Sequence, residues 1–103
     1  MKDIIKRFGG KWHHGDSEEC FIEIGDLVKF QGLNESFEAG KIELLGKPRL
    51  TIMQTWTVDF NFLTESNKYE VSIVLKSKGR IYLTVSKVVN GKLVGLISGM
   101  FRK

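Results

Sequence analysis

Apolar and polar residues alternate along most of this chain with the two-residue period of half-buried β-strands. The clearest run covers residues 50–63. Fourteen residues exceed the usual strand length of about 3–10, so we expect this run to bend sharply or to form two strands that share a corner. Its apolar parity, interrupted by one amide, predicts an inward face made of Leu50, Ile52, Gln54, Trp56, Val58, Phe60 and Phe62.

Shorter alternating runs on both sides predict further strands, separated by loops rich in glycine and polar residues. We expect loops near residues 32–36, 46–49, 64–68 and 77–80. Inner faces are predicted at Tyr69, Val71, Ile73 and Leu75 and at Ile81, Leu83 and Val85. The alternating apolar positions of the earlier strands are Cys20, Ile22, Ile24, Val28, Phe30, Ile42 and Leu44.

The last hairpin carries the strongest turn signal, because Asn90-Gly91 favours a two-residue type I′ turn. That turn would pair Val89 with Lys92 and Val85 with Leu96. The inner face of the final strand would then be formed by Leu96, Ser98, Met100 and Arg102. An outer apolar stripe would be formed by Leu93, Ile97 and Phe101, and it would need cover from a terminal helix or a second subunit.

Only the first eight residues have helical spacing, with Ile4, Ile5 and Phe8 on one face and Gly9-Gly10 as the stop. No other segment is long enough for a helical crossover between parallel strands, which excludes α/β folds. We therefore expect an all-β fold, a small antiparallel meander barrel of about eight strands with a short N-terminal helix. At 103 residues the chain forms a single domain, 1–103.

The two ends of the chain share a further pattern. Phe8-Gly9-Gly10-Lys11-Trp12 joins the helix to the first strand, and Arg102 stands near the end of the last one. This combination resembles the calycin superfamily of lipocalins, fatty-acid-binding proteins, avidins and staphostatins. The resemblance implies a lipocalin-like barrel in which Arg102 packs across Trp12 and closes one end. Unlike fatty-acid-binding proteins, the chain leaves only about seven residues after Trp12 before its next strand, with no helical lid.

Composition narrows the class of protein. The apolar fraction of 42% and charged fraction of 27% are typical of globular domains. One cysteine excludes an intramolecular disulfide. No apolar run approaches the roughly 20 residues of a membrane span, and the N-terminus lacks the apolar core of a secretory signal. We expect a cytoplasmic protein with no membrane partner.

The net charge of +4 is uneven, because residues 53–103 carry eight basic and three acidic side chains. The surplus gathers at Lys76, Lys78 and Arg80 around one turn. This turn could meet phosphate or an acidic protein surface. We favour a different interpretation of this charge, in which the turn is a solvated hairpin end whose lysines keep the sheet edge soluble.

Candidate chemistry is sparse. His13, His14 and Cys20 belong to the one cluster of metal-capable side chains, His13-His14-Gly15-Asp16-Ser17-Glu18-Glu19-Cys20. Adjacent histidines on a strand point to opposite faces, and no second ligand motif follows, so we expect no metal and no cofactor. Cys20 alternates in phase with buried positions and is expected in the core. No phosphate loop, nucleophile elbow or zinc-protease motif is present, which indicates a protein that is not an enzyme.

The interior of an eight-stranded barrel holds side chains or one small ligand. We expect a binding protein that engages another protein, as an inhibitor or immunity-type partner, with a homodimer as an alternative. The residues assigned to that contact are Leu93, Ile97, Phe101, Lys76, Lys78 and Arg80. A second hypothesis is a carrier of a small apolar ligand, lined by Gln54, Trp56 and Phe60. A third, less favoured, is a nucleic-acid-binding OB-like barrel that uses Lys76, Lys78, Arg80 and Tyr82.

Overall fold

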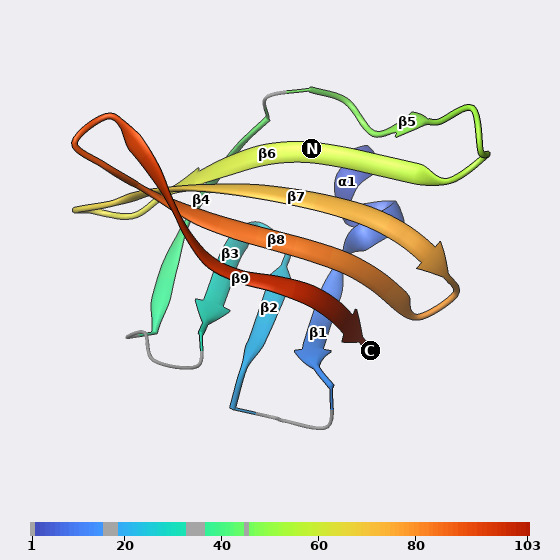
Figure 1. Cartoon of the computed structure of the whole chain (residues 1–103), viewed down its shortest axis with the longest axis horizontal. Coiled ribbons are helices and arrows are strands. Elements are labelled where there is room, and N and C mark those ends of the chain that lie inside the picture. Colours follow the sequence, from blue (N-terminus) through green and yellow to red (C-terminus); the bar gives the residue numbers. More distant parts are fainter. Residues whose placement is uncertain (1, 16–18, 33–36, 45) are drawn as a thin grey trace.

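The structure, a computed structural model, describes residues 2–15, 19–32, 37–44 and 46–103 (Figure 1). The predicted loop at 33–36 and the Asp16–Glu18 part of the histidine cluster lie outside these residues. The described chain forms one helix and nine strands. In chain order they are α1 (Lys2–Phe8), β1 (Gly10–His14), β2 (Phe21–Ile24), β3 (Leu27–Gln31), β4 (Glu38–Leu44), β5 (Arg49–Leu50), β6 (Trp56–Leu63), β7 (Lys68–Ser77), β8 (Arg80–Val89) and β9 (Lys92–Arg102).

Eight of these strands close into an antiparallel barrel, which confirms the predicted fold class. The hydrogen-bonded order is β4-β3-β2-β1-β9-β8-β7-β6, and β4 pairs with β6 to complete the ring. The two-residue strand β5 pairs with the outer part of β6 and stands outside the ring. Every pairing is antiparallel, as expected for a chain joined by hairpins.

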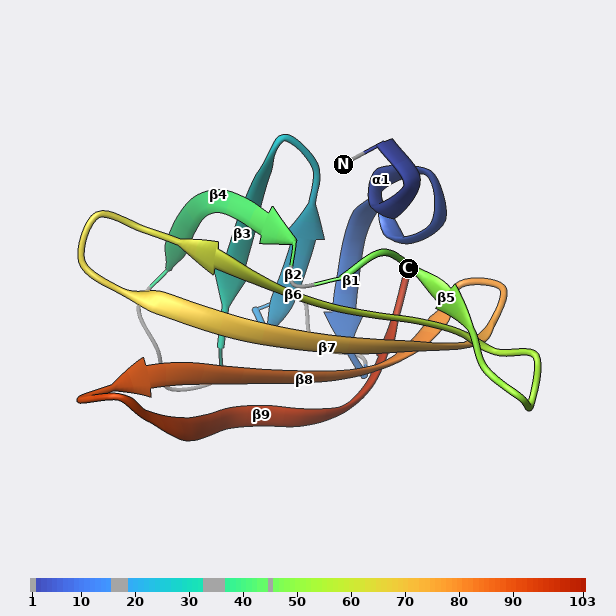
Figure 2. The ribbon, with the colours of Figure 1, turned by 90° about the horizontal axis from the view of Figure 1, so that it is seen from above.

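The barrel is flattened into two layers whose strands cross steeply. Figure 1 shows the short strands β1–β4 running across the long strands β6–β9, and Figure 2 shows the same crossing from above. The core lies between these layers. It consists of Phe8, Trp12, Cys20, Ile22, Ile24, Val28, Phe30, Val58, Phe60, Phe62, Tyr69, Val71, Ile73, Ile81, Leu83, Val85 and Phe101, all at most 2% exposed.

The helix α1 belongs to this core at one end of the barrel. Phe8 is fully buried and Ile5 packs against the core, so the predicted apolar face is confirmed for these two residues; the side chain of Ile4 lies outside the described part. Gly9 ends the helix with a hydrogen bond from its N–H to the carbonyl of Ile5, 2.8 Å. A Cβ at Gly9 would clash with that same carbonyl, so only glycine fits there.

The run 50–63 does contain the predicted corner, but the inward direction of its first half was wrong. The chain reverses through a turn at residues 51–55, and the strand β6 begins only at Trp56. Leu50 is 52% exposed, and Ile52 and Gln54 are also exposed. The period-2 pattern assigns a face only while the backbone stays extended, and the turn breaks that relation.

The last hairpin begins as predicted. Asn90 and Gly91 have φ values of 52° and 77°, and Val89 pairs with Lys92. A β-bulge then shifts the register, because Ser86 pairs with Gly95 but Val85 pairs with Ile97. The predicted pairing of Val85 with Leu96 is therefore wrong by one residue.

The bulge moves the end of β9 to the other face of the sheet. Phe101 pairs with Ile81 and is 1% exposed, while Met100 pairs with Tyr82 and is 44% exposed. Leu96 and Ile97 both pack against the core. The predicted outer stripe therefore does not exist: of its three members, only Leu93 remains largely exposed. Likewise Ser98, Met100 and Arg102 lie outside, contrary to the expected inner face.

Candidate binding surface at one end of the barrel

Four segments that are distant in sequence meet at one end of the barrel. They are α1, the turn between β5 and β6, the turn between β7 and β8, and the C-terminal residues after β9 (Figures 1 and 2). We call this end the basic end, because Lys6, Arg7, Arg49, Lys76, Lys78, Arg80 and Lys103 are exposed in these segments. The hairpin turn at Asn90-Gly91 lies at the opposite end of the barrel, separated from the basic end by the ten-residue strand β8.

The most exposed apolar side chains of the basic end belong to the turn at residues 51–55, here called the tip turn. Ile52 is 100% exposed and Met53 is 83% exposed. Thr51 and Thr55 hold the base of the turn, with a backbone bond of 2.9 Å from the Thr51 N–H to the Thr55 carbonyl and a bond of 2.7 Å between their hydroxyls. Gln54 has a positive φ of 59°, which sharpens the reversal. The turn therefore presents two large apolar side chains on a hydrogen-bonded frame.

A stacked cation joins the helix to the strand next to the tip turn. The guanidinium carbon of Arg7 lies 3.4 Å from the centroid of the Trp56 ring. Trp56 itself pairs with Leu50 and packs partly against the core. This contact fixes the end of α1 against the base of the tip turn.

A hollow of about 450 Å³ lies beside this contact. It is lined by Arg7, Trp12, Leu75, Lys78, Gly79 and Lys103. The backbone N–H of Lys103 donates to the carbonyl of Gly79 at 3.1 Å, which ties the C-terminal segment to the β7–β8 turn. Three cations from three segments thus surround an apolar wall.

The cation over Trp12 differs from the one that the sequence indicated. Lys103 Nζ lies 5.0 Å from the centroid of the Trp12 ring. Arg102 pairs with His13 on the outer face of β1, and its Nε donates to the carbonyl of Gly15 at 2.9 Å. Trp12 points into the core and Arg102 is exposed, so the cation found over the indole is Lys103, the residue after β9. The expected Trp12–Arg102 stack is therefore corrected to Trp12–Lys103.

Most of the basic side chains at this end form no ion pair with a described residue. Among the described residues, one ion pair is found, between Arg49 and Asp59 at 3.9 Å, and both side chains are largely exposed. The turn cations Lys76, Lys78 and Arg80 are all exposed, as the sequence predicted. An excess of positive charge therefore surrounds the tip turn and the hollow.

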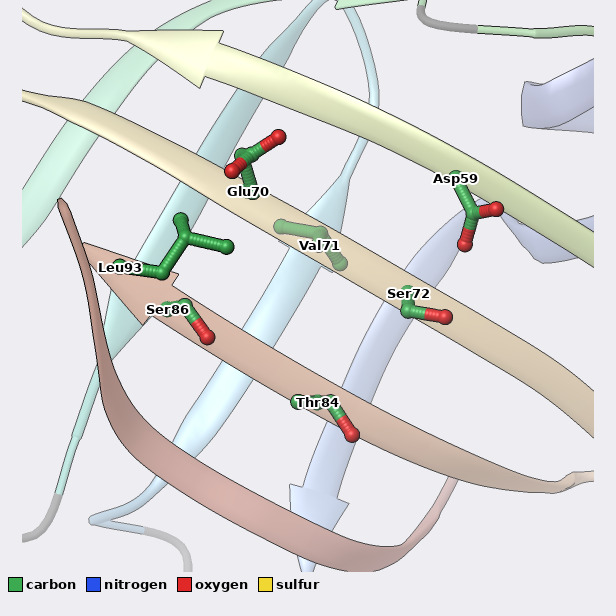
Figure 3. A pocket seen from close by; sticks show the side chains of 7 residues that line it. All are labelled: Asp59, Glu70, Val71, Ser72, Thr84, Ser86 and Leu93. Atoms are coloured by element: carbon green, nitrogen blue, oxygen red, sulfur yellow. The ribbon is translucent and has the colours of Figure 1, made fainter. Parts of the chain in front are cut away.

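A second hollow, of about 360 Å³, lies on the outer face of the sheet (Figure 3). Asp59 and Glu70 supply carboxylates, and Leu93 stands at one side. The hydroxyls around it come from Ser72, Thr84 and Ser86. The lining therefore offers two carboxylates and three hydroxyls as hydrogen-bonding groups.

Asn61 lies next to this hollow and is fully buried, although it belongs to the outer parity of β6. It pairs with Glu43 and Glu70 on the neighbouring strands. Neither its amide nitrogen nor its oxygen has a hydrogen-bond partner among the described residues. The sequence pattern had placed Asn61 on the polar face and gave no sign of this burial.

The other sequence-predicted residues are divided between the two ends and the core. Trp56 and Gln54 lie at the basic end, whereas Phe60 is fully buried in the core. Leu93 lies near the start of β9 and pairs with Val88, next to the Asn90-Gly91 turn at the opposite end. The sequence patterns did not single out Arg7 or Met53. The available signal for Met53 was the adjacent apolar pair Ile52-Met53, which stands between Thr51 and Thr55.

The histidine cluster does not assemble into a metal site within the described residues, where no three His, Cys, Asp or Glu side chains are placed to hold an ion. His14 packs its ring against Phe101, with the ring centroids 5.1 Å apart. Cys20 is buried, as predicted, and desolvation raises the pKa of its thiol. A buried thiol with a raised pKa holds its proton and is a poor nucleophile.

The described part of the chain contains no helix with the length and apolar character needed to cross a membrane. Comparisons with protein-family models, with curated proteins and with solved structures found no match to this chain.

Proposed function

We propose that this chain is a non-catalytic binding protein whose partner is another protein, held on the outside of the basic end. The observation that carries the proposal is the tip turn, in which Ile52 and Met53 are almost wholly exposed on a hydrogen-bonded frame. Such side chains gain free energy only when a partner covers them.

The geometry of the tip turn suits insertion into a partner's pocket. The paired threonines Thr51 and Thr55 restrict the turn before binding, so little conformational entropy is lost on association. Leu50 adds a third exposed apolar side chain at the base. The surrounding cations favour a partner with an acidic rim and speed the encounter.

The filled interior supports a function on the outside. Phe60, Phe62 and Tyr69 are fully buried and pack together, with the Phe62 and Tyr69 rings stacked at 4.8 Å. The carrier hypothesis assigned Gln54 as the polar anchor of an internal ligand, but this side chain lies in the tip turn. A small apolar ligand therefore loses its expected hydrogen-bonding group.

We also propose kinship with the calycin superfamily. Its support is the short helix, the glycine and tryptophan at the start of β1, the eight-stranded antiparallel ring, and the pairing of the first strand with the last. An inhibitor or immunity-type role is the form of protein binding that this kinship favours. The chain departs from the expected calycin pattern in one respect, because Lys103 lies over Trp12 where Arg102 was expected.

The test is site-specific crosslinking. A photo-reactive phenylalanine analogue replaces Met53 in one variant and Leu93 in another, and both proteins are irradiated in their source cells. We expect a protein adduct at position 53 and none at position 93, with the partner identified by mass spectrometry. The purified partner is then titrated with wild type and with the Ile52→Ser/Met53→Ser double variant, which should bind at least tenfold more weakly.

Leu93→Ser is the matched control, because Leu93 is an exposed apolar residue toward the other end. It should bind as wild type does. Loss of binding in Leu93→Ser, with the double variant unaffected, would move the interface to the other end. An RNA or DNA adduct at position 53, with affinity falling steeply between 50 and 200 mM salt, would favour the nucleic-acid hypothesis instead.

A further inference from the structure

We propose that the hollow beside α1 binds a phosphate group carried on a small apolar body, a property separate from the protein partner. Its cations are Arg7, Lys78 and Lys103, and its accessible apolar wall is formed by Leu75 and Gly79, because Trp12 borders the hollow but is only 1% exposed.

Arg7 is held in a position that suits an oxyanion. Its guanidinium carbon lies 3.4 Å from the Trp56 ring centroid, a stacking distance. A stacked guanidinium keeps its N–H groups in the plane of the group, and these edges remain able to donate two parallel hydrogen bonds to one phosphate. Arg7 is exposed and lines the hollow, so a ligand can reach it.

The two lysines come from segments that are fixed to each other. The hydrogen bond from the Lys103 N–H to the Gly79 carbonyl holds the C-terminal residue against the β7–β8 turn that carries Lys78. Lys103 Nζ also lies over Trp12, 5.0 Å from its centroid. The site is therefore partly organised before a ligand arrives, which lowers the entropic cost of binding.

No acidic side chain among the described residues pairs with the cations of the hollow. No ion pair to Arg7, Lys78 or Lys103 is found within the described residues, whose one ion pair joins Arg49 and Asp59. The lining of the hollow includes no acidic side chain. Three cations match a phosphate dianion better than a carboxylate, whose single charge would leave most of the repulsion in place.

The wall indicates that the phosphate carries an apolar group. Leu75, which is half-buried and continuous with the core, lines the hollow together with Gly79, whereas Trp12 contributes almost no accessible surface. A volume of about 450 Å³ lies within the range of small-molecule sites, about 300–1,000 Å³. An inorganic ion alone would leave the apolar wall uncovered. A soluble organic phosphate and the headgroup of an anionic lipid share the chemistry that this hollow would recognise.

The chain reports on the site by itself, because its two tryptophans, Trp12 and Trp56, lie at the hollow and under Arg7. The experiment titrates the protein with phenyl phosphate, inorganic phosphate and benzoate and follows tryptophan fluorescence, with calorimetry as a second measurement. We expect phenyl phosphate to bind at least about tenfold more tightly than the other two, since it alone supplies the dianion and the apolar body. Equal affinities, or no binding of phenyl phosphate, would overturn the proposal.

Variants then test the assigned cations. Lys78→Gln and Lys103→Gln should each weaken phenyl phosphate binding several-fold, and Arg7→Lys should weaken it about tenfold because the charge stays but the planar fork is lost. Lys92→Gln is the matched control, since it removes an equal charge at the opposite end. Circular dichroism melts check that each variant is folded. If Lys92→Gln weakens binding as much as Lys78→Gln, general charge attraction and not this hollow explains it.

A vesicle arm separates the two sources of the phosphate. The protein is sedimented with vesicles of a neutral lipid alone and of the same lipid with phosphatidic acid. Binding only to the anionic vesicles, lost in Lys78→Gln, assigns the phosphate to a lipid headgroup. Tight phenyl phosphate binding without vesicle binding assigns it to a soluble organic phosphate.

Discussion

The indole Nε1 of Trp12 donates a buried hydrogen bond of 2.8 Å to the backbone carbonyl of Phe8. That carbonyl is at the last residue of α1, where helical carbonyls have no partner within the helix. One side chain of the first strand therefore completes the helix and fixes it to the barrel.

Replacing Trp12 with phenylalanine should lower the free energy of unfolding by about 2 kcal/mol, because it leaves a buried carbonyl unpaired and removes core volume. Urea unfolding measures the change. Trp56→Phe is the comparison, since Trp56 is only half-buried; it should cost about 1 kcal/mol or less. Equal losses in both variants would show that the hydrogen bond to Phe8 adds little.

The bulge in the last hairpin makes opposite predictions for two adjacent residues. Phe101→Ala should destabilise the fold by about 3–5 kcal/mol, whereas Met100→Ala should cost less than about 1 kcal/mol. The reason is that Phe101 is 1% exposed and Met100 is 44% exposed. Chemical denaturation of the two variants checks the register, and a larger loss at Met100 would restore the unbulged pairing.

Gln54 occupies a backbone conformation that favours glycine. Its φ of 59° lies in the left-handed region, where an L side chain costs about 1–2 kcal/mol and glycine is unstrained. Because glycine also loses more entropy on folding, Gln54→Gly should stabilise the protein by a net amount of about 0.5 kcal/mol. The melting temperature should rise by a few degrees. Gly79→Ala, at φ 77°, should have the opposite effect.

Burial of Cys20 makes stability depend on alkaline pH. Desolvation raises the pKa of the folded thiol above the ordinary value of 9.0, so the folded state holds its proton where the unfolded chain loses it. Stability should therefore be unaffected below pH 9 by this group and should fall as the pH rises above 9. Cys20→Ala should flatten that part of the profile, measured by urea unfolding between pH 7 and 10. An unchanged slope would assign the loss to other groups.

The barrel could be predicted because its elements depend on local patterns. Alternation in β7 and β8 correctly assigned Val71, Ile73 and Leu83 to the core, and the Asn90-Gly91 signal fixed the last turn. Helical spacing in the first eight residues correctly placed Ile5 and Phe8 on the apolar face of a short helix. These features require only the period of a strand, the period of a helix and the preferences of a turn.

The two wrong assignments, at the bulge in β9 and at the turn of residues 51–55, share one physical origin. In both, the backbone changes direction while the apolar pattern of the sequence continues. Leu96 and Ile97 are both apolar, so the sequence does not show which of them is the extra residue of the bulge. Ile52 has the right parity for an inner face, but the turn places it in solvent. The hollow at the basic end could not be predicted from local patterns, because Arg7, Lys78 and Lys103 come from segments far apart in the chain.

The shortest strand pairing in the barrel ring, between β1 and β9, should determine where the ring opens. Among the described residues, strands β1 and β9 pair at His13–Arg102 and His14–Phe101, whereas β8 and β9 are paired along nearly their whole length. A short ladder opens more often than a long one, so this seam should breathe while the hairpins stay intact. Amide protons of the β1–β9 seam should then exchange with deuterium well before those in the middle of β8. Opening of this seam would then be the first step of unfolding.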